Sequence, residues 1–464
     1  MNGIGKWIVL LAMGLYVAFG SHAAPPDTLQ GKDFRKLERR ARKGNVPAML
    51  WLADYYTAQA PDDSLQAYWY GQAALRGDTL AEKNLGNCYL NGTGVEKDYH
   101  KALEWYGKAA RKGYASALHN LGLMYANGWG VPLSDSLAYV YFRQAAEKGL
   151  HLSEYMVGWC YESGCCVETD YCSAYEWYKK AAEKQFAPAI FRLGLLAYYG
   201  RYVPEDNYVA VDYFLKAAEL GDRNAENMLG ICFEKGYGVE KSLEKMAEWF
   251  GRAAGHGQAE AQYRLGECYW DGLGVEKDSS KAMRWFEKSA GQGNPDGLCA
   301  LGKCYYDGEV VKQDYRKSFQ YYKQAAEGGS ACGQRVVGLF YENGYGMEED
   351  IRQAVEWYDK AVKQEDRFAL EFLGSCYAEG RGVERDEKRA FTLFRASAEK
   401  GHAPGMYRLA LCYKQGVGVK KDRQRYLYWL QKAADAKSWA AAEELEAQRS
   451  REIGFGNSGD AWLF

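Results

Sequence analysis

Residues 85–113 read LGNCYLNGTGVEKDYHKALEWYGKAARKG, and variants of this stretch recur along most of the 464-residue chain. A fixed period between 20 and 50 residues indicates an array of stacked supersecondary units. Ala53 begins the series 33 residues before Gly86, and Ala410 ends it. The chain therefore holds eleven copies of one repeat. With Gly86 as the reference glycine, the same position returns every 36 residues at Gly122, Gly158, Gly194, Gly230, Gly266, Gly302, Gly338 and Gly374.

Each repeat has the pattern of two helices. A small residue five positions before the reference glycine, an aliphatic residue directly before it and an aromatic residue three positions after it lie on one side of a helix at about 100° per residue. We expect this first helix to end at Gly92, because glycine readily adopts the left-handed conformation that closes a helix. Asp98 is expected to cap the second helix, which ends at Gly113. Since the connection is short, the two helices should be antiparallel.

The repeated pattern AxxxLGxxYxxGxGVxxDxxKAxxWYxKAAxxG resembles the Sel1-like repeat, a relative of the tetratricopeptide repeat. The resemblance covers residues 45–437, which would hold all eleven repeats. It implies an all-α fold, a right-handed superhelical solenoid of about eleven antiparallel helix pairs with terminal capping helices. It also implies adaptor work, in which the protein holds parts of a larger complex together, as in protein quality control or polysaccharide export.

The first 23 residues have the features of a signal peptide. Lys6 precedes an apolar run from Trp7 to Gly20, and Ser21-His22-Ala23 supplies small residues for cleavage. This run is shorter than the roughly 20 residues that span a bilayer. An uncleaved anchor is the alternative, and a lipid-anchored form is not favoured because the first cysteine is Cys88. We expect an exported protein, periplasmic or secreted.

The segments that flank the repeats are predicted to be caps. Residues 24–44 should hold an N-terminal cap helix, basic from Lys32 to Lys43, which either keeps the terminal repeat soluble or contacts an acidic surface. Residues 438–464 should hold a C-terminal cap helix from Trp439 to Arg449, followed by a loose tail from Gly454. The formal charge of −2 gives no sign of a nucleic-acid binder.

Twelve cysteines in a chain predicted to be exported raise the question of disulfides. Equivalent positions of neighbouring helices are about 8–10 Å apart, beyond the roughly 7 Å that a disulfide allows between Cα atoms. Cysteines at one repeat position should therefore be buried free thiols. Cys299 and Cys332 have no obvious partner. Seven cysteines stand two residues after the reference position: Cys88, Cys160, Cys232, Cys268, Cys304, Cys376 and Cys412.

Repeat four differs because four cysteines surround its loop. The spacing allows a disulfide from Cys165 or Cys166 to Cys172, or to Cys160. Cys166 also replaces the second loop glycine, as Tyr202 does in repeat five and Val310 in repeat eight. The sequence therefore does not specify the backbone conformation of these three turns.

Cysteine-rich exported relatives within the Sel1-like family carry one disulfide partner at the second alanine of the KAA triplet. Here that position holds Ala110, Ala146, Ala182 and Ala218. The penicillin-binding or β-lactamase activity sometimes attached to that branch is therefore not carried over.

No catalytic, cofactor or metal site is predicted. The six histidines do not pair at i, i+4 and do not stand at zinc-finger spacing from cysteines. The sequence has no GxSxG, GxxxxGK[ST] or HExxH motif, and its GxGV segments recur as turns between helices. We expect no enzyme and no cofactor.

A partner-binding surface is predicted on the side of the first helices that faces away from the core, the inner wall of a curved array. Large aromatic residues are a poor choice for a surface that serves solubility alone. The predicted groove suits a protein or peptide with basic or apolar anchors, or a glycan. The alternative is that several of these rings pack against neighbouring repeats. The predicted residues are Tyr155, Trp159, Phe191, Tyr198, Tyr199, Tyr263, Glu267, Trp270, Asp271 and Tyr306.

One position of the second helix is expected to supply the core instead. It holds Trp69, Trp105, Trp177, Trp249, Trp285, Trp357 and Trp429.

Together these observations predict a non-enzymatic scaffold or adaptor of the cell envelope that binds a partner protein. The alternative is a glycan-binding envelope protein or a component of polysaccharide export. A cell-wall hydrolase or β-lactamase-like enzyme is a distant third.

Overall fold

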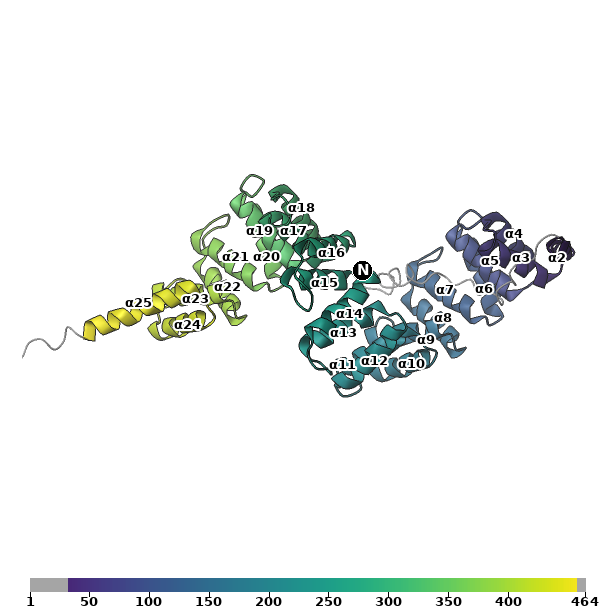
Figure 1. Cartoon of the computed structure of the whole chain (residues 1–464), viewed down its shortest axis with the longest axis horizontal. Helices are drawn as coiled ribbons and strands as arrows, with labels where there is room; N and C mark the ends of the chain where they lie inside the picture. Colours follow the sequence, from purple (N-terminus) through teal and green to yellow (C-terminus); the bar gives the residue numbers. More distant parts are fainter. Residues whose placement is uncertain (1–31, 457–464) are drawn as a thin grey trace, which may run out of the picture. The chain divides into compact units, whose positions relative to one another are not determined.

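A computed structural model describes residues 32–456 of the chain. Within that range the secondary structure consists of α-helices, labelled α2 to α25, and contains no strand (Figure 1). The all-α repeat solenoid predicted from the sequence is confirmed. The predicted signal peptide, residues 1–23, and residues 457–464 lie outside the described residues. No helix of the described part is both long enough and apolar enough to span a membrane.

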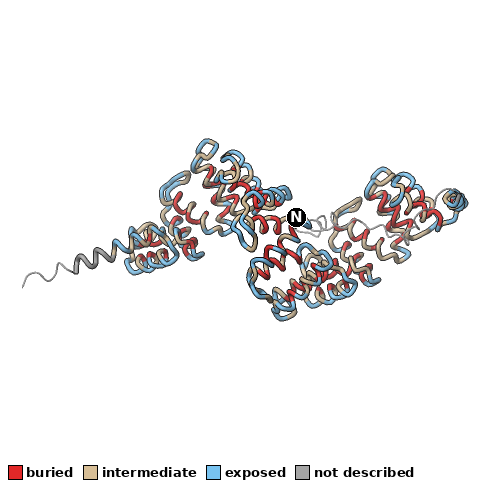
Figure 2. The backbone as a smooth tube through the Cα atoms, in the orientation of Figure 1, coloured by how far each residue is buried: buried red, intermediate tan, exposed pale blue. Residues whose placement is uncertain are grey.

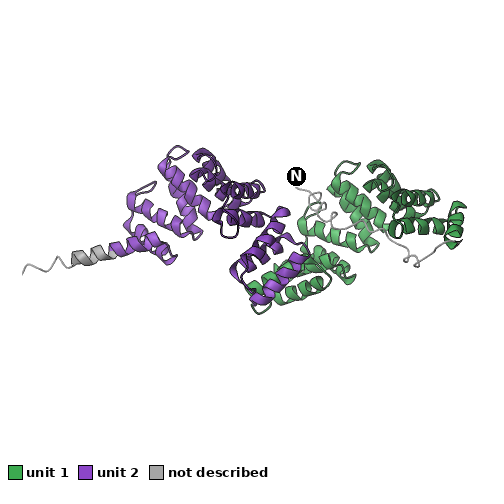
Figure 3. Ribbon diagram, turned by 45° about the horizontal axis from the view of Figure 1, so that its top comes forward, with its two compact units in different colours: residues 1–241 green, residues 242–464 purple. Residues whose placement is uncertain are grey.

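The chain divides into two compact units, unit 1 up to Lys241 and unit 2 from Ser242 (Figure 3). The helices of unit 1 are α2 (Lys32–Arg42), α3 (Val46–Ala58), α4 (Asp63–Ala74), α5 (Thr79–Asn91), α6 (Tyr99–Arg111), α7 (Ala115–Asn127), α8 (Asp135–Glu147), α9 (His151–Ser163), α10 (Tyr171–Glu183), α11 (Ala187–Tyr198), α12 (Asn207–Glu219) and α13 (Arg223–Lys235). Those of unit 2 are α14 (Leu243–Gly255), α15 (Ala259–Asp271), α16 (Ser279–Gly291), α17 (Pro295–Asp307), α18 (Tyr315–Glu327), α19 (Ala331–Asn343), α20 (Ile351–Val362), α21 (Arg367–Glu379), α22 (Glu387–Glu399), α23 (Ala403–Gln415), α24 (Arg423–Asp435) and α25 (Trp439–Gly456).

Within each unit, successive helices pack as hairpins, and each hairpin packs on the next. The boundary between the units falls between α13 and α14, the two helices of repeat six. Buried residues follow the helix faces that meet inside each unit, while the loops are exposed (Figure 2).

The turn of repeat two shows why the hairpin forms. Gly92 ends α5 in the left-handed conformation, with φ +78°, and its N–H donates to the Cys88 carbonyl at 2.8 Å. The Asp98 carboxylate accepts the backbone N–H groups of His100 and Lys101 at 3.0 Å each. These contacts satisfy groups that a helix end would otherwise leave without partners. Both predicted helix boundaries are confirmed.

The reference glycine is needed because an aromatic ring of the second helix lies against the first. A Cβ on Gly122 would stand 2.6 Å from Phe142 Cε1, closer than real Cβ contacts come. Phe142 is fully buried. The glycine therefore brings the two helices of a repeat to close distance. Rings occupy the same position, 20 residues after the reference glycine, at Tyr106, Tyr178, Phe214, Phe286, Tyr322, Tyr358 and Phe394.

The prediction that the repeated tryptophans form the core is confirmed for Trp69 and holds only in part for Trp105, Trp177, Trp357 and Trp429, which pack against the core from its side. Trp69 is buried, but Trp105 and its later equivalents are half-buried. In repeats two, four, seven and nine the tryptophan directly precedes the ring that packs on the reference glycine, and adjacent helical residues point about 100° apart. The tryptophan therefore lies beside the core, where the Lys108 ammonium stands 3.7 Å from the Trp105 ring centroid.

The three loops without the second glycine differ from one another. Tyr202 keeps the left-handed conformation, with φ +69°. The other non-glycine residues with positive φ in the described chain are Gln185, Glu365 and Lys437, so Cys166 and Val310 do not share it.

Both caps cover the core at the ends of the array. Ala41 of α2 is fully buried, and the Phe34 ring stands 6.4 Å from that of Trp51. This packing accounts for α2 as a structural cap. At the other end, α25 begins at Trp439 as predicted but continues past Arg449 to Gly456, so the tail predicted from Gly454 is wrong for residues 454–456.

Candidate functional site

The predicted groove residues of unit 1 pack largely against their own core. Tyr155 on α9 is only 5% exposed, and its ring centroid lies 5.6 Å from those of Tyr178 and Phe186. The prediction that Tyr155 lines a surface is therefore wrong. Its ring packs against that of Tyr178, on the second helix of the same repeat. Trp159, which directly follows Gly158, is half-buried against the same cluster.

The rings of α11 lie closer to solvent. Phe191 is half-buried, 5.7 Å from Phe214 between centroids. Tyr198 is also half-buried and stands 5.0 Å from Tyr199 and 5.9 Å from Tyr237. Tyr199 is 56% exposed. In this part of the chain the expected alternative, rings that pack against their neighbours, describes most of the predicted residues.

In unit 2, four predicted residues come together in one pocket of about 320 Å³. One wall is α15, and the facing wall is α17, the first helix of the next repeat. The base is formed by side chains from α16, α18 and α19. We call this the α15–α17 pocket. It is lined by Tyr263, Glu267, Trp270, Asp271, Phe286, Asp296, Cys299, Ala300, Lys303, Cys304, Tyr322 and Cys332.

Aromatic rings form much of the pocket's apolar surface. The centroids of Tyr263 and Trp270 lie 6.0 Å and 6.2 Å from that of Phe286. Tyr263 and Trp270 are seven residues apart and therefore lie on one face of α15. Both are half-buried, so part of each ring remains accessible.

Carboxylates lie beside these rings. The Tyr263 hydroxyl donates to Glu267 Oε1 at 2.6 Å. Burial raises the pKa of Glu267, and burial together with the neighbouring Glu260 carboxylate raises that of Asp296. With Asp271, the lining carries three carboxylates and one ammonium, that of Lys303. The pocket is therefore acidic.

Sequence reasoning missed a pair of thiols in this pocket. Cys299 and Cys332, for which no partner was expected, both line it, and each thiol shifts the pKa of the other. Arg335 Nη2 also lies 3.5 Å from Cys332 Sγ and donates to it. The Cys299 thiol and the Arg335 charge lower the pKa of Cys332 to about 7, whereas the Cys332 thiol and burial raise that of Cys299.

The signal for this pair was its spacing. The two cysteines are 33 residues apart, so Cys332 stands one helical turn earlier in its repeat than Cys299 does. This offset is compatible with a contact between packed first helices, and α17 and α19 do pack together.

Tyr306 does not line the α15–α17 pocket. Its ring belongs to an aromatic cluster with Tyr315, Phe340 and Tyr345 at centroid distances of 5.3, 5.8 and 5.6 Å.

The predicted disulfide candidates of repeat four, Cys160, Cys165, Cys166 and Cys172, are not joined by a disulfide in the structure. The seven cysteines at the repeated position are buried, as predicted. A bridge in repeat four stays a prediction.

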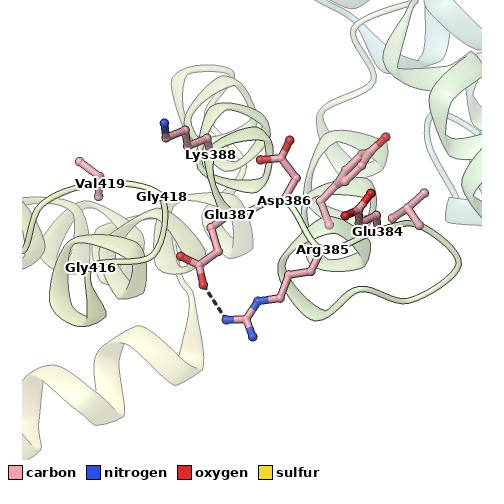
Figure 4. Close-up of a pocket in the computed structure, with 10 residues that line it drawn as sticks. Glu384, Arg385, Asp386, Glu387, Lys388, Gly416, Gly418 and Val419 are labelled. Atoms are coloured by element: carbon pink, nitrogen blue, oxygen red, sulfur yellow. Dashed lines mark hydrogen bonds and ion pairs between the residues drawn. The ribbon is translucent and has the colours of Figure 1, made fainter.

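Two larger hollows in unit 2 lie at equivalent loop positions of different repeats. One of about 860 Å³ lies between successive hairpin loops, where Arg385 pairs with Glu387 at 2.6 Å (Figure 4). A second of about 710 Å³ is lined by Tyr341 and Met347, which stand 36 residues before lining residues of the first, Tyr377 and Val383. Because these hollows recur with the loop, we take the α15–α17 pocket as the candidate site.

The 36-residue repeat also matches a known protein family. A family model described as Sel1 repeat matches ten consecutive segments between residues 79 and 438. The chain belongs to the Sel1 repeat family. Sel1 repeat proteins are generally non-enzymatic scaffolds, and their repeats usually mediate protein binding. The pair α3 and α4 has the same hairpin form as the matched repeats, although the family model does not extend to it.

This Sel1 repeat protein is similar to several solved structures of repeat proteins. A protective antigen of uropathogenic Escherichia coli strains, which displays an SLR fold, is 33% identical, with a TM-score of 0.66 and 90% of each chain covered. A Sel1 repeat protein from Oxalobacter formigenes is 32% identical, with a TM-score of 0.50, covering 53% of this chain and 99% of its own. No curated protein matches the chain.

Proposed function

We propose that this Sel1 repeat protein is a scaffold of the cell envelope that binds a segment of a partner protein in the α15–α17 pocket. The observation that carries the proposal is the combination of half-buried aromatic rings and three carboxylates, of which Glu267 is half-buried and Asp271 and Asp296 are exposed, in one pocket between adjacent repeats. An envelope location is supported by the signal-like sequence of residues 1–23.

The size of the pocket favours a side-chain anchor on an extended segment. A volume of about 320 Å³ is at the low end of the usual range for ligand sites. It accommodates one or two side chains of a partner. The partner would therefore insert an anchor residue, and its flanking residues would lie along α15 and α17.

The chemistry of the lining favours a lysine or arginine anchor with apolar flanks. A cation placed over the Trp270 or Tyr263 ring gains a cation–π interaction, and Glu267 or Asp296 can accept its hydrogen bonds. Both carboxyl groups have raised pKa values because burial disfavours their charge. An incoming cation would offset that cost.

A peptide library displayed on phage, selected on the purified protein, tests this proposal. We expect enriched sequences with a basic residue beside apolar ones, and we expect Trp270→Ala to lose their binding. Trp439 on α25, which is 76% exposed, provides the matched control variant Trp439→Ala. Enrichment that ignores Trp270, or no enrichment of basic anchors, would contradict the proposal.

A glycan-binding envelope protein, or a component of polysaccharide export, is the second candidate, because aromatic rings flanked by carboxylates also bind sugars. Affinity electrophoresis in gels containing envelope polysaccharides separates the two. Retarded mobility that Trp270→Ala abolishes would favour the glycan, and unchanged mobility would remove it. The distant third candidate, a hydrolase or β-lactamase-like enzyme, predicts turnover of peptidoglycan or nitrocefin above the buffer rate.

A further inference from the structure

Three thiols of unit 1 converge where α9 ends. The Sγ atoms of Cys160, Cys165 and Cys166 all lie within 4.8 Å of one another, and those of Cys165 and Cys166 are 3.4 Å apart. With metal–sulfur bonds of about 2.3 Å, two sulfur ligands of one ion stand about 3.8 Å apart in a tetrahedral site and about 4.0 Å apart in a trigonal one. The observed spacing brackets these values, so the three sulfurs are placed to share an ion.

The cluster arises because the loop of repeat four carries cysteines at two positions where that of repeat two has none. Cys160 occupies the position that holds a buried cysteine in seven repeats. Gly164 then ends α9 with φ +68°, as glycine does elsewhere, and Cys165-Cys166 follows. Repeat two has Thr93-Gly94 at these positions. Because Cys166 does not take the left-handed conformation of Gly94, its loop follows a different path, which ends beside the Cys160 thiol.

The surroundings of the three thiols are apolar on one side and open on the other. Cys160 is buried, whereas Cys165 and Cys166 are half-buried and pack with Val167 and Tyr161 against the same hydrophobic cluster. No histidine or carboxylate joins this cluster of potential ligands in the described residues. A sulfur-only set in such a setting selects soft cations over magnesium, calcium or manganese.

We propose that Cys160, Cys165 and Cys166 form a binding site for one monovalent copper ion. Three thiolates complete a trigonal coordination, which suits Cu⁺ without a further ligand. Binding releases one proton from each thiol, forms three Cu–S bonds and leaves the oxidation state of copper and sulfur unchanged. The ion enters from the solvent side, past Cys165 and Cys166.

A disulfide is the competing use of these thiols. Adjacent residues have Cα atoms about 3.8 Å apart across a trans peptide, below the 4.4–6.8 Å range of disulfides, so a Cys165–Cys166 bond would be strained. A bond from Cys160 to either loop cysteine would leave the third thiol unused. Metal binding alone uses all three.

The test is competition for copper between the reduced full-length protein and the coloured Cu⁺–bicinchoninate complex. The key variant, Cys165→Thr with Cys166→Gly, restores the loop sequence of repeat two and should fold at least as well as the parent. We expect the parent to remove one equivalent of copper more than this variant does. Thermal unfolding monitored by circular dichroism checks that the variant is folded.

Two controls locate the site. Cys172→Ser changes the exposed cysteine of the same repeat, and Cys299→Ser with Cys332→Ser removes the thiol pair of unit 2. Both should keep the equivalent that the loop variant loses. The proposal is overturned if the parent and the folded loop variant withdraw equal amounts of copper. It is also overturned if peptide mapping finds a Cys160 disulfide to either loop cysteine and the reduced chain takes up no copper there.

Discussion

The Tyr263 hydroxyl donates a 2.6 Å hydrogen bond to the Glu267 carboxylate one helical turn further along α15. Both side chains line the α15–α17 pocket, so the bond holds a carboxylate beside an aromatic ring. Burial raises the pKa of Glu267 in spite of this bond. Arg264 Nη1 also lies 3.7 Å from Glu267 Oε2, and a cationic anchor in the pocket would give this carboxylate a further partner.

The affinity for a lysine-anchored peptide should depend on pH. Because the pKa values of Glu267 and Asp296 are raised, both carboxyl groups take up protons at a higher pH than usual as the solution is acidified. Binding should be strongest near neutrality and weaken as the pH falls toward, but still above, about 4. Fluorescence anisotropy of a labelled peptide measures this. The double variant Glu267→Gln, Asp296→Asn should bind weakly with a flat profile, and a flat profile for the parent would refute the account.

The same shift predicts that Asp296→Asn does not destabilise the protein at neutral pH. A carboxyl group with a raised folded-state pKa binds protons more readily in the folded chain, so its ionised form lowers stability above the unfolded pKa. Removing it should leave the melting temperature unchanged or higher at pH 7, with no gain below the unfolded pKa near 4. Asp307→Asn, which changes another exposed carboxylate of α17 outside the pocket, is the control. A lower melting temperature for Asp296→Asn alone would mean that the Asp296 carboxylate stabilises the folded chain, which would contradict the prediction.

The reference glycine should be intolerant of even one methyl group. A Cβ on Gly374 would stand 2.7 Å from Phe394 Cε1, so Gly374→Ala forces the helices of that repeat apart. We expect a loss of about 1–3 kcal/mol in unfolding free energy. A Cβ on Gly251, in helix α14 of the same unit, would meet no other atom within 4 Å, and Gly251→Ala should gain up to about 1 kcal/mol. Chemical denaturation compares the two, and equal effects would contradict the packing role.

Cys332 should be the more reactive thiol of the pocket pair. Its pKa is lowered to about 7 by the Cys299 thiol and by Arg335, and the thiolate is the reacting species. Alkylation by iodoacetamide, followed by peptide mass spectrometry, should give a Cys332 rate that rises with a midpoint near pH 7. Arg335→Gln should move the midpoint upward. Faster alkylation of Cys299 than of Cys332 would reverse the assignment.

The fold was predictable because its signals repeat. Gly92 and Asp98 fix one turn, and the 36-residue period copies that turn along the chain. The position of Trp105 beside the core was not predictable from helical periodicity, because its neighbour Tyr106 shares the apolar side and only packing decides which ring meets Gly86.

The candidate site was predicted only in part, for a related reason. Tyr155 and Tyr263 occupy the same position of their repeats, yet one is buried and the other lines a pocket. The difference comes from neighbouring side chains such as Phe186, which covers Tyr155. The contact between Cys299 and Cys332 depends on how two first helices meet, and one repeat alone does not specify that.

The most direct test of the α15–α17 pocket is the affinity of a lysine-anchored peptide for the Trp270→Ala variant. Truncation of a central aromatic residue costs about 2 kcal/mol or more at binding hot spots, which corresponds to a loss of about 30-fold. We predict that loss by isothermal titration calorimetry, with Trp439→Ala equal to the parent. Equal affinity of Trp270→Ala and the parent would contradict the account.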